Sequence, residues 1–232
     1  MPLMKPRAPR PRKAEQQFDA ALARRSLLRA DRDLVDTVDA VLAGAASKAG
    51  THLVCRAGCS ECCYGPFPIN RLDAFRLQEG WRALRERDPG TAEAVMTRTR
   101  AAVKGMTRDF PGEAAIGRLG GDQAAENQFF ERHAGEACPV LDPATQTCTL
   151  YEHRPVSCRI YGPPLRVQGE DLPPCRLCFT EADAKTIEAC RVEPDPHGLE
   201  RAILQRLKRD GGDDRETLIA WAVLDAAERS EK

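Results

Sequence analysis

The chain has 232 residues, with 35 basic and 35 acidic side chains, 42% hydrophobic residues, 5% aromatic residues and ten cysteines. Zero net charge and few aromatic rings argue against a dedicated nucleic-acid binder, which needs a basic surface. The longest apolar run, Leu218 to Leu224, is far shorter than the roughly 20 residues of a membrane span. We therefore expect neither a nucleic-acid partner nor a membrane.

Residues 1–13 combine four prolines with five basic residues and no acidic residue. This composition predicts a disordered basic arm, because it offers almost nothing to bury. The segment also lacks the apolar stretch and cleavage site of a secretory signal. We therefore expect a cytoplasmic protein, in which clustered thiols favour metal binding or redox chemistry over structural disulfides.

Hydrophobic periodicity predicts a mainly α-helical protein. Apolar residues recur at three- and four-residue steps over 14–50, which indicates one or two N-terminal helices. The same pattern predicts helices over 71–87, 91–106, 180–190, 198–208 and 215–228. Thr180 is the expected N-cap of the helix over 180–190. The arginine-rich faces of the helices over 71–87 and 91–106 are expected to face solvent.

Strand signals are sparse and limited to 147–151 and 165–168. The predicted class is therefore mainly α, with irregular cysteine-rich metal-binding loops held between helices and little regular β. Residues 51–192 are expected to form a cysteine-cluster domain with a helical insertion over 71–136. The C-terminal helices within 193–232 are expected to pack on that same domain.

Nine of the ten cysteines fall into three groups. In the first group, four cysteines lie within nine residues around Gly58, which permits the chain to turn so that several sulfurs face one point. The third group is a CxxC pair, whose two-residue gap lets both sulfurs reach one soft metal ion. The expected metal ligands are Cys55, Cys59, Cys62, Cys63, Cys138, Cys148, Cys158, Cys175 and Cys178. Whether Cys190 is also a metal ligand is left open, since a buried free cysteine can simply pack as a small hydrophobic residue.

These motifs resemble a known family. The residues that carry the resemblance are the series Cys55, Cys59, Cys62 and Cys63, the segments 138–141 and 148–151, and the run Arg154-Pro155-x2-Cys158-Arg159-x-Tyr161. Together they are similar to the bacterial YkgJ family of cysteine-cluster domains, over roughly residues 52–190. The resemblance implies chelation of zinc or iron, and it implies no substrate.

Both zinc and a four-iron cluster accept four cysteines. The Cys138-Pro139 pair is typical of ferredoxin motifs and favours an iron–sulfur (4Fe-4S) cluster, with electron transfer or another redox role and a protein redox partner. The alternative is a structural zinc-binding interaction module, in which His52 or His153 could join the ligands. A third alternative is a radical S-adenosylmethionine-like methylase, because the spacing of Cys55, Cys59 and Cys62 matches that motif.

Four arginines lie within four residues of a cysteine: Arg56, Arg154, Arg159 and Arg176. A site with four thiolates carries net negative charge, which is costly to bury without cations or backbone amides nearby. These arginines are therefore candidate partners of the metal-bound sulfurs.

Overall fold

The computed structural model describes residues 13–209 and 215–230; the side chains of 13–24 and 228–230 are not described. The arm predicted over 1–13 therefore lies outside the described residues, except for its last residue. The helices are α1 (Lys13–Ala49), α2 (Arg71–Arg87), α3 (Pro89–Met106), α4 (Gln123–Arg132), α5 (Val156–Arg159), α6 (Ala184–Ala189), α7 (Leu199–Arg209) and α8 (Ile219–Ser230). The mainly helical class is confirmed.

The strands of the described residues form three antiparallel pairs of two or three residues per strand. These pairs are β1 (Gly112–Glu113) with β2 (Arg118–Leu119), β3 (Leu141–Asp142) with β4 (Thr147–Cys148), and β5 (Leu165–Val167) with β6 (Glu170–Leu172). Regular β-structure is as sparse as the sequence predicts.

Several boundaries follow from their capping residues. Asn70 accepts from the backbone N–H groups of Leu72 and Asp73, so α2 begins where the periodicity begins. Pro89 occupies the first turn of α3 and Asp88 caps it, so this helix starts two residues before the predicted Thr91.

The predicted N-cap at Thr180 is wrong. The helix in that region, α6, starts only at Ala184, and the side chain of Asp183 accepts from the backbone N–H of Thr186. The preceding turn ends at Phe179, whose φ of 57° is incompatible with a helix.

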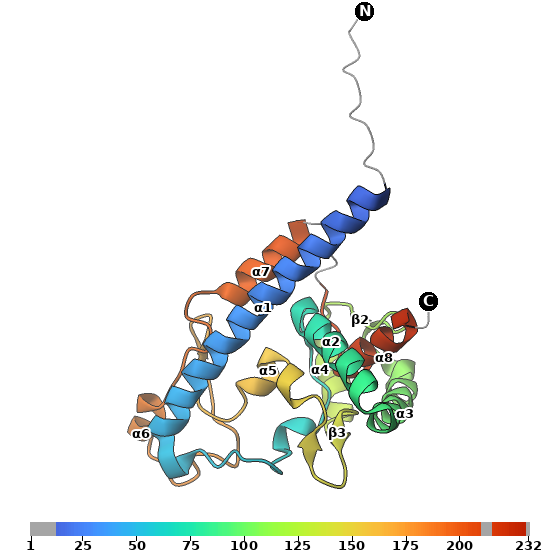
Figure 1. The fold of residues 1–232 in the computed structure, drawn as a ribbon. Helices are drawn as coiled ribbons and strands as arrows, with labels where there is room; N and C mark the ends of the chain where they lie inside the picture. The colour runs from blue at the N-terminus through green and yellow to red at the C-terminus, as the bar shows by residue number, and fades with distance from the viewer. Residues whose placement is uncertain (1–12, 210–214, 231–232) are drawn as a thin grey trace, which may run out of the picture.

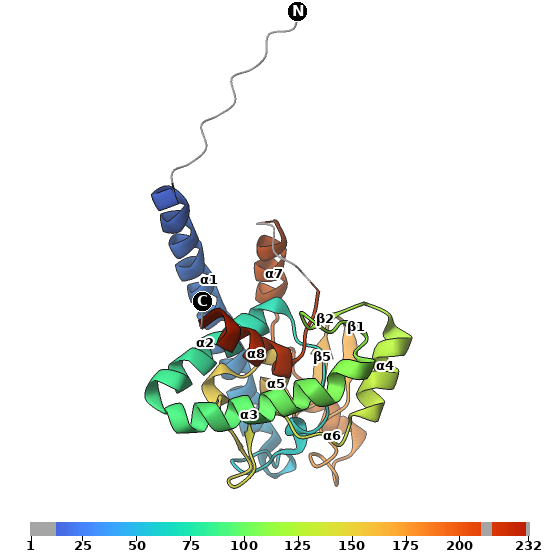
Figure 2. The same ribbon diagram turned by 90° about the vertical axis from the view of Figure 1, so that its right-hand side faces the viewer.

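The main core lies between α2, α3 and α8 (Figures 1 and 2). Leu77 of α2, Val95 of α3 and Val223 of α8 are fully buried there. Three of the predicted ligands, Cys138, Cys148 and Cys158, pack against this cluster. The loops that carry these cysteines therefore rest on the best-packed part of the molecule.

The long helix α1 runs diagonally beside α7 and α5 (Figure 1). Leu34 and Val38 of α1 are fully buried against Leu72 of α2 and Val156 of α5. None of the described helices is both long and apolar enough to cross a membrane.

Arg76 contradicts the expectation that the arginines of α2 face solvent. Its side chain is 3% exposed and lies between two acidic residues, Asp31 of α1 and Asp73 of α2. Arg76 Nε donates to Asp31 at 3.1 Å, and its Nη1 donates to Asp73 at 2.7 Å and to the carbonyl of Arg154 at 3.2 Å. The opposite charges offset the cost of burial, which explains why this arginine lies inside.

A histidine anchors the segment that leads from α4 to Cys138. His133 Nδ1 lies 2.9 Å from Glu136, and its Nε2 lies 3.2 Å from Asp109. Burial lowers the pKa of His133, but the hydrogen bonds with Glu136 and Asp109 outweigh it, so the pKa is raised above its ordinary value.

We expect this contact to make stability depend on pH. A raised pKa in the folded state stabilises the protein fully below the unfolded pKa of about 6.5, and this contribution is lost as pH rises through the folded pKa. The free energy of unfolding of the native chain should therefore exceed that of His133→Gln by more at pH 6 than at pH 9, measured by urea denaturation. An equal difference at both pH values would mean that His133 stays neutral.

Candidate metal centre

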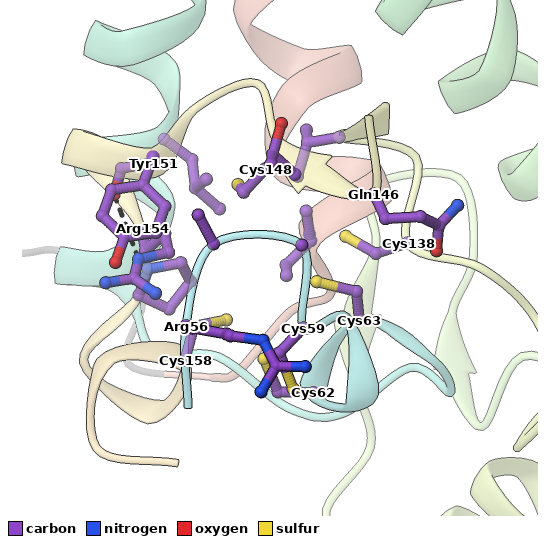
Figure 3. Close-up of a pocket in the computed structure, with 17 residues that line it drawn as sticks. Arg56, Cys59, Cys62, Cys63, Cys138, Gln146, Cys148, Tyr151, Arg154 and Cys158 are labelled. Atoms are coloured by element: carbon purple, nitrogen blue, oxygen red, sulfur yellow. Dashed lines mark hydrogen bonds between the residues drawn. The ribbon is translucent and has the colours of Figure 1, made fainter. Parts of the chain in front are cut away.

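Six cysteines from four segments line one cavity of about 340 Å³ (Figure 3). The cavity lies between the cysteine loop after α1, the β3–β4 hairpin and α5. The sulfurs of Cys63 and Cys138 point from neighbouring segments into the hollow (Figure 3). The lining cysteines are Cys59, Cys62, Cys63, Cys138, Cys148 and Cys158.

Backbone pairing joins the first cysteine group to the segment that carries Cys138. The N–H of Cys138 donates to the carbonyl of Cys63 at 2.7 Å, and the N–H of Gly65 donates to the carbonyl of Glu136 at 2.8 Å. Residues 63–65 and 136–138 thus lie antiparallel, with a bridge between Tyr64 and Ala137. This pairing fixes two predicted ligands side by side.

Two further lining cysteines come from the hairpin and from α5. Cys148 lies opposite Leu141 in the β3–β4 pair. Cys158 lies in α5, whose first N–H, that of Val156, donates to Asp73 at 2.9 Å. The buried cluster of Asp73 and Arg76 therefore holds α5, and with it Cys158, against α2.

Backbone N–H groups face the sulfurs of several cysteines. Burial raises the pKa of Cys138 to about 12, while the N–H groups of Val140 and Leu141 donate to its sulfur and act in the opposite direction. Burial likewise raises the pKa of Cys148, opposed by the N–H of Leu150. Because such donors stabilise a thiolate, the backbone around these sulfurs suits their metal-bound, deprotonated form.

Cys62 differs from the other thiols of the cavity. Its hydrogen bond with Cys63 and the charge of Arg154 lower the pKa of Cys62 to about 6, against the effect of burial. The same hydrogen bond, followed by burial, raises the pKa of Cys63. Burial raises the pKa of Cys158 well above its ordinary value. A metal that binds here must therefore displace protons from most of its ligands.

Two of the four candidate arginines line the cavity, namely Arg56 and Arg154. The guanidinium of Arg154 lies over the ring of Tyr151 at 3.7 Å from its centroid, and Nε donates to the Tyr151 carbonyl at 3.1 Å (Figure 3). Arg154 is thereby held at the rim, where its charge partly offsets the burial that raises the pKa of Cys148.

The other two arginines serve other contacts. Arg159 is buried and pairs with Asp39 of α1 at 2.8 Å, although its charge still lowers the pKa of Cys148. Arg176 is exposed and pairs with Glu61 at 2.9 Å, outside the cavity lining.

Histidine takes no part in the lining of this cavity. The ring of His153 packs against Gly80 of α2, where a Cβ on the glycine would approach it to 2.5 Å. The ring of His52 stacks on Phe179 at 5.7 Å.

The other predicted ligands lie outside the cavity. Cys55 and Cys175 line a neighbouring hollow of about 450 Å³, together with Cys59, Cys62 and Cys158. Cys178 and Cys190 are buried beside Cys175 in a separate hydrophobic cluster. The structure thus divides the nine predicted ligands into two groups, with Cys59, Cys62 and Cys158 bordering both hollows.

Sequence patterns assign no individual role to two residues that line the cavity and to one that supports it, and Tyr151 enters only as the last residue of the motif segment 148–151. Tyr151 and Gln146 form part of the wall, and Gln146 accepts from the hydroxyl of Ser60 at 2.9 Å, which ties the hairpin turn to the cysteine loop. Asp73 of α2 supports α5 by accepting from the backbone N–H of Val156. A polar residue in a loop or on a helix is ordinary in sequence, so only the fold reveals these contacts.

The donor chemistry of the cavity fits a thiophilic metal or cluster. Among the described residues that line it there is no His, Asp or Glu, so its strong side-chain donors are all sulfur. As the side chains stand, no group of three or more His, Cys, Asp or Glu among the described residues is arranged to hold a metal ion. Binding therefore requires the sulfurs to draw together.

A mainly helical scaffold that presents clustered thiols defines a cysteine-cluster metal-binding domain. Residues 54–176 match the family model CxxCxxCC, described as "Putative zinc- or iron-chelating domain", and the chain belongs to this family. The resemblance to the YkgJ family is confirmed only at the level of this broader domain. Neither the curated proteins nor the solved structures gave a significant match.

Proposed function

We propose that the central cavity holds an iron–sulfur cluster of the 4Fe-4S type and that the protein transfers electrons to a redox partner in the cytoplasm. The observation that carries the proposal is the size of the cavity combined with its donors. Four of the lining cysteines would hold the cluster: Cys138, Cys148, Cys158 and one of the adjacent pair Cys62 and Cys63.

The cavity has room for more than a single ion. A water molecule takes about 30 Å³ in the liquid, so a cavity of about 340 Å³ accommodates a group several times larger than one ion. A cluster with its own sulfides occupies more of this volume, and it accepts cysteine thiolates as its only protein ligands.

The charges of the chain also suit an anionic cluster. Burial is the main cause of the raised pKa values of Cys138 and Cys158, and the neighbouring thiolates Cys62 and Cys148 raise both further. Arg154, Arg56 and the backbone N–H groups of 140 and 150 face this negative charge from the rim and the wall. Cations and amide donors of this kind raise the reduction potential of a cluster, because they stabilise its more negative reduced state.

The cavity also lies within reach of a partner. The six lining cysteines are only partly buried, and Tyr151 at the rim is 53% exposed. When bound, the cluster supplies one-electron chemistry. The chain itself binds the cluster, orients it with α5 and the hairpin, and offers Arg56 and Arg154 to a docking protein.

The structural zinc module stays the second candidate, because the cavity joins four loop segments that a metal could simply tie together. The radical S-adenosylmethionine-like methylase finds no support, since the strands of the described residues form only two-stranded sheets rather than a barrel.

The test is a redox titration of protein purified without oxygen. We expect a broad visible absorption that bleaches when dithionite is added, and that is absent from Cys158→Ser. Cys190→Ser is the matched control, because Cys190 is buried but does not line the cavity. Colourless protein with bound zinc would favour the structural zinc module over electron transfer. Protein with neither metal would refute metal binding.

Arg154→Ala is expected to keep the metal but bind it about 10- to 100-fold more weakly, as found when outer partners of metal ligands are removed. Together with the hydrogen bond from Cys63, the charge of the Arg154 guanidinium lowers the pKa of Cys62. Competition with a chelator measures the change. Arg100→Ala on α3, which removes an exposed arginine near Glu93, is the control and should change nothing. Equal metal affinity in both variants would show that Arg154 does not contribute to metal binding.

A further inference from the structure

A second group of thiols lies apart from the central cavity. Cys175 and Cys178 are 7% and 3% exposed and pack with Ala49 and Phe179 in a cluster separate from the main core. Cys55 joins them from the loop after α1, and its sulfur lies 3.8 Å from that of Cys178. Neither Cys55, Cys175 nor Cys178 lines the central cavity.

Three distant segments are fixed around this pair by backbone hydrogen bonds. The N–H of Phe179 donates to the carbonyl of His52 at 2.8 Å, and the N–H of Cys175 donates to the carbonyl of Gly162 at 3.0 Å. The N–H of Cys178 closes a turn on the carbonyl of Cys175 at 2.8 Å. These hydrogen bonds hold the backbone segments that carry the two sulfurs next to each other.

Gly162 makes room for the sulfur of Cys55. Its φ is +139°, which other residues rarely adopt, and a Cβ there would lie 2.9 Å from the Cys55 sulfur and 3.2 Å from Leu53. A glycine is therefore required both by the backbone conformation and by the close approach of the thiol. The Cys55 sulfur also lies 3.9 Å from the carbonyl oxygen of Tyr161.

The sulfur separation matches one kind of metal site. In a tetrahedral zinc site with Zn–S bonds of about 2.3 Å, two thiolates lie about 3.8 Å apart. Cys55 and Cys178 lie at this separation. In a four-iron cluster each iron takes its own cysteine, so the cysteine sulfurs are held further apart than two ligands of a single ion.

Two more thiols are near enough to complete four ligands. Cys175 packs with Cys178 in the same buried cluster, and its sulfur accepts from the N–H of Leu177, the same pattern that Cys138 and Cys148 show with the residues after them. Cys59 lines the same hollow as Cys55 and Cys175.

We propose that Cys55, Cys59, Cys175 and Cys178 form a second metal site, which binds a single zinc ion in tetrahedral geometry. Cys178 lies beyond the residues 54–176 that match the family, so family membership does not assign it. The Cys55–Cys178 pair is already at ligand separation, and the sulfurs of Cys59 and Cys175 approach it when the ion binds. The site closes the junction between the loop after α1 and the segment before α6, and it does not depend on what the central cavity holds.

The test counts zinc and iron in anaerobically purified full-length variants. Cys55→Ser changes an exposed residue and Cys178→Ser a buried one, so the first remains informative if the second does not fold. We expect each to lose about one zinc per chain and to keep the metal of the central cavity. Cys158→Ser should do the opposite. Cys190→Ser, which changes a third buried cysteine of the same cluster, should keep both metals.

Two outcomes would overturn the second site. The first is an unchanged zinc content in Cys55→Ser. The second is intact protein in which Cys55 and Cys178 form a disulfide after purification without oxygen, detected by peptide mass spectrometry without reduction. If the central cavity binds zinc rather than a cluster, the native chain contains more zinc, but Cys55→Ser should still lose about one ion. Failure of the proposed cluster is thereby distinguished from failure of this site.

Discussion

Arg76→Met should lower the free energy of unfolding by about 3–5 kcal/mol, because it leaves the two carboxylates buried without their cation. Asp73 is 2% exposed and Asp31 is 6% exposed, so solvent cannot replace the lost arginine. Methionine keeps much of the packing volume, which isolates the loss of charge. Urea denaturation followed by circular dichroism measures the change.

The pH dependence of this variant identifies its cause. Burial already raises the pKa of Asp73 in the native chain, against the charge of Arg76. Without the arginine the pKa of Asp73 in the folded state rises further, so the folded variant takes up a proton at a higher pH than the unfolded chain does. The stability of the variant therefore increases as pH falls toward the pKa of the carboxyl in the unfolded chain. The deficit of Arg76→Met should therefore be smaller at pH 5 than at pH 8.

The exposed Arg100→Ala serves again as a control, and should stay within about 0.5 kcal/mol of the native chain. A loss below about 1 kcal/mol in Arg76→Met, independent of pH, would show that the buried pairs contribute little.

Removal of the bound metal should loosen the cysteine segments while the helical core persists. Residues 52–70 and 138–190 contain mostly turns and short strands, which are joined by single hydrogen bonds such as that between Cys138 and Cys63. Metal binding contributes its free energy only to the folded arrangement of such loops. The core of α2, α3 and α8 is held instead by buried apolar side chains.

Hydrogen exchange with and without a chelator measures this difference. Amides in 52–70 and 138–190 should lose protection, and those of α3 and α8 should keep it. Uniform protection in both states would mean that the cysteines are merely packed side chains and hold no metal.

The helices could be predicted where a cap coincides with the start of the periodic pattern. α2 begins and ends at the predicted residues because Asn70 caps it and Asp88 ends it. α3 begins two residues before the predicted 91, because proline is favourable in the first turn of a helix and Pro89 occupies it. The position of α6 was missed because the turn through Phe179 is fixed by a hydrogen bond to His52, a residue far away in the sequence.

The cysteines could be predicted as a set but not as two groups. Spacing along the chain shows which thiols are neighbours in sequence, and it does not show that Cys63 meets Cys138 or that Cys55 meets Cys178. Arg76 illustrates the same limit, because an arginine on a helix looks solvated until its partner Asp31 on another helix is known. The contact of Arg76 with Asp31 depends on the packing of α1 against α2.

Iron and acid-labile sulfide in anaerobically purified protein test the central claim most directly. A 4Fe-4S cluster in the cavity predicts about four iron ions and about four sulfides per chain, both lost together in Cys138→Ser and both kept in Cys190→Ser. Protein that contains zinc without sulfide, or iron that survives Cys138→Ser unchanged, would contradict it.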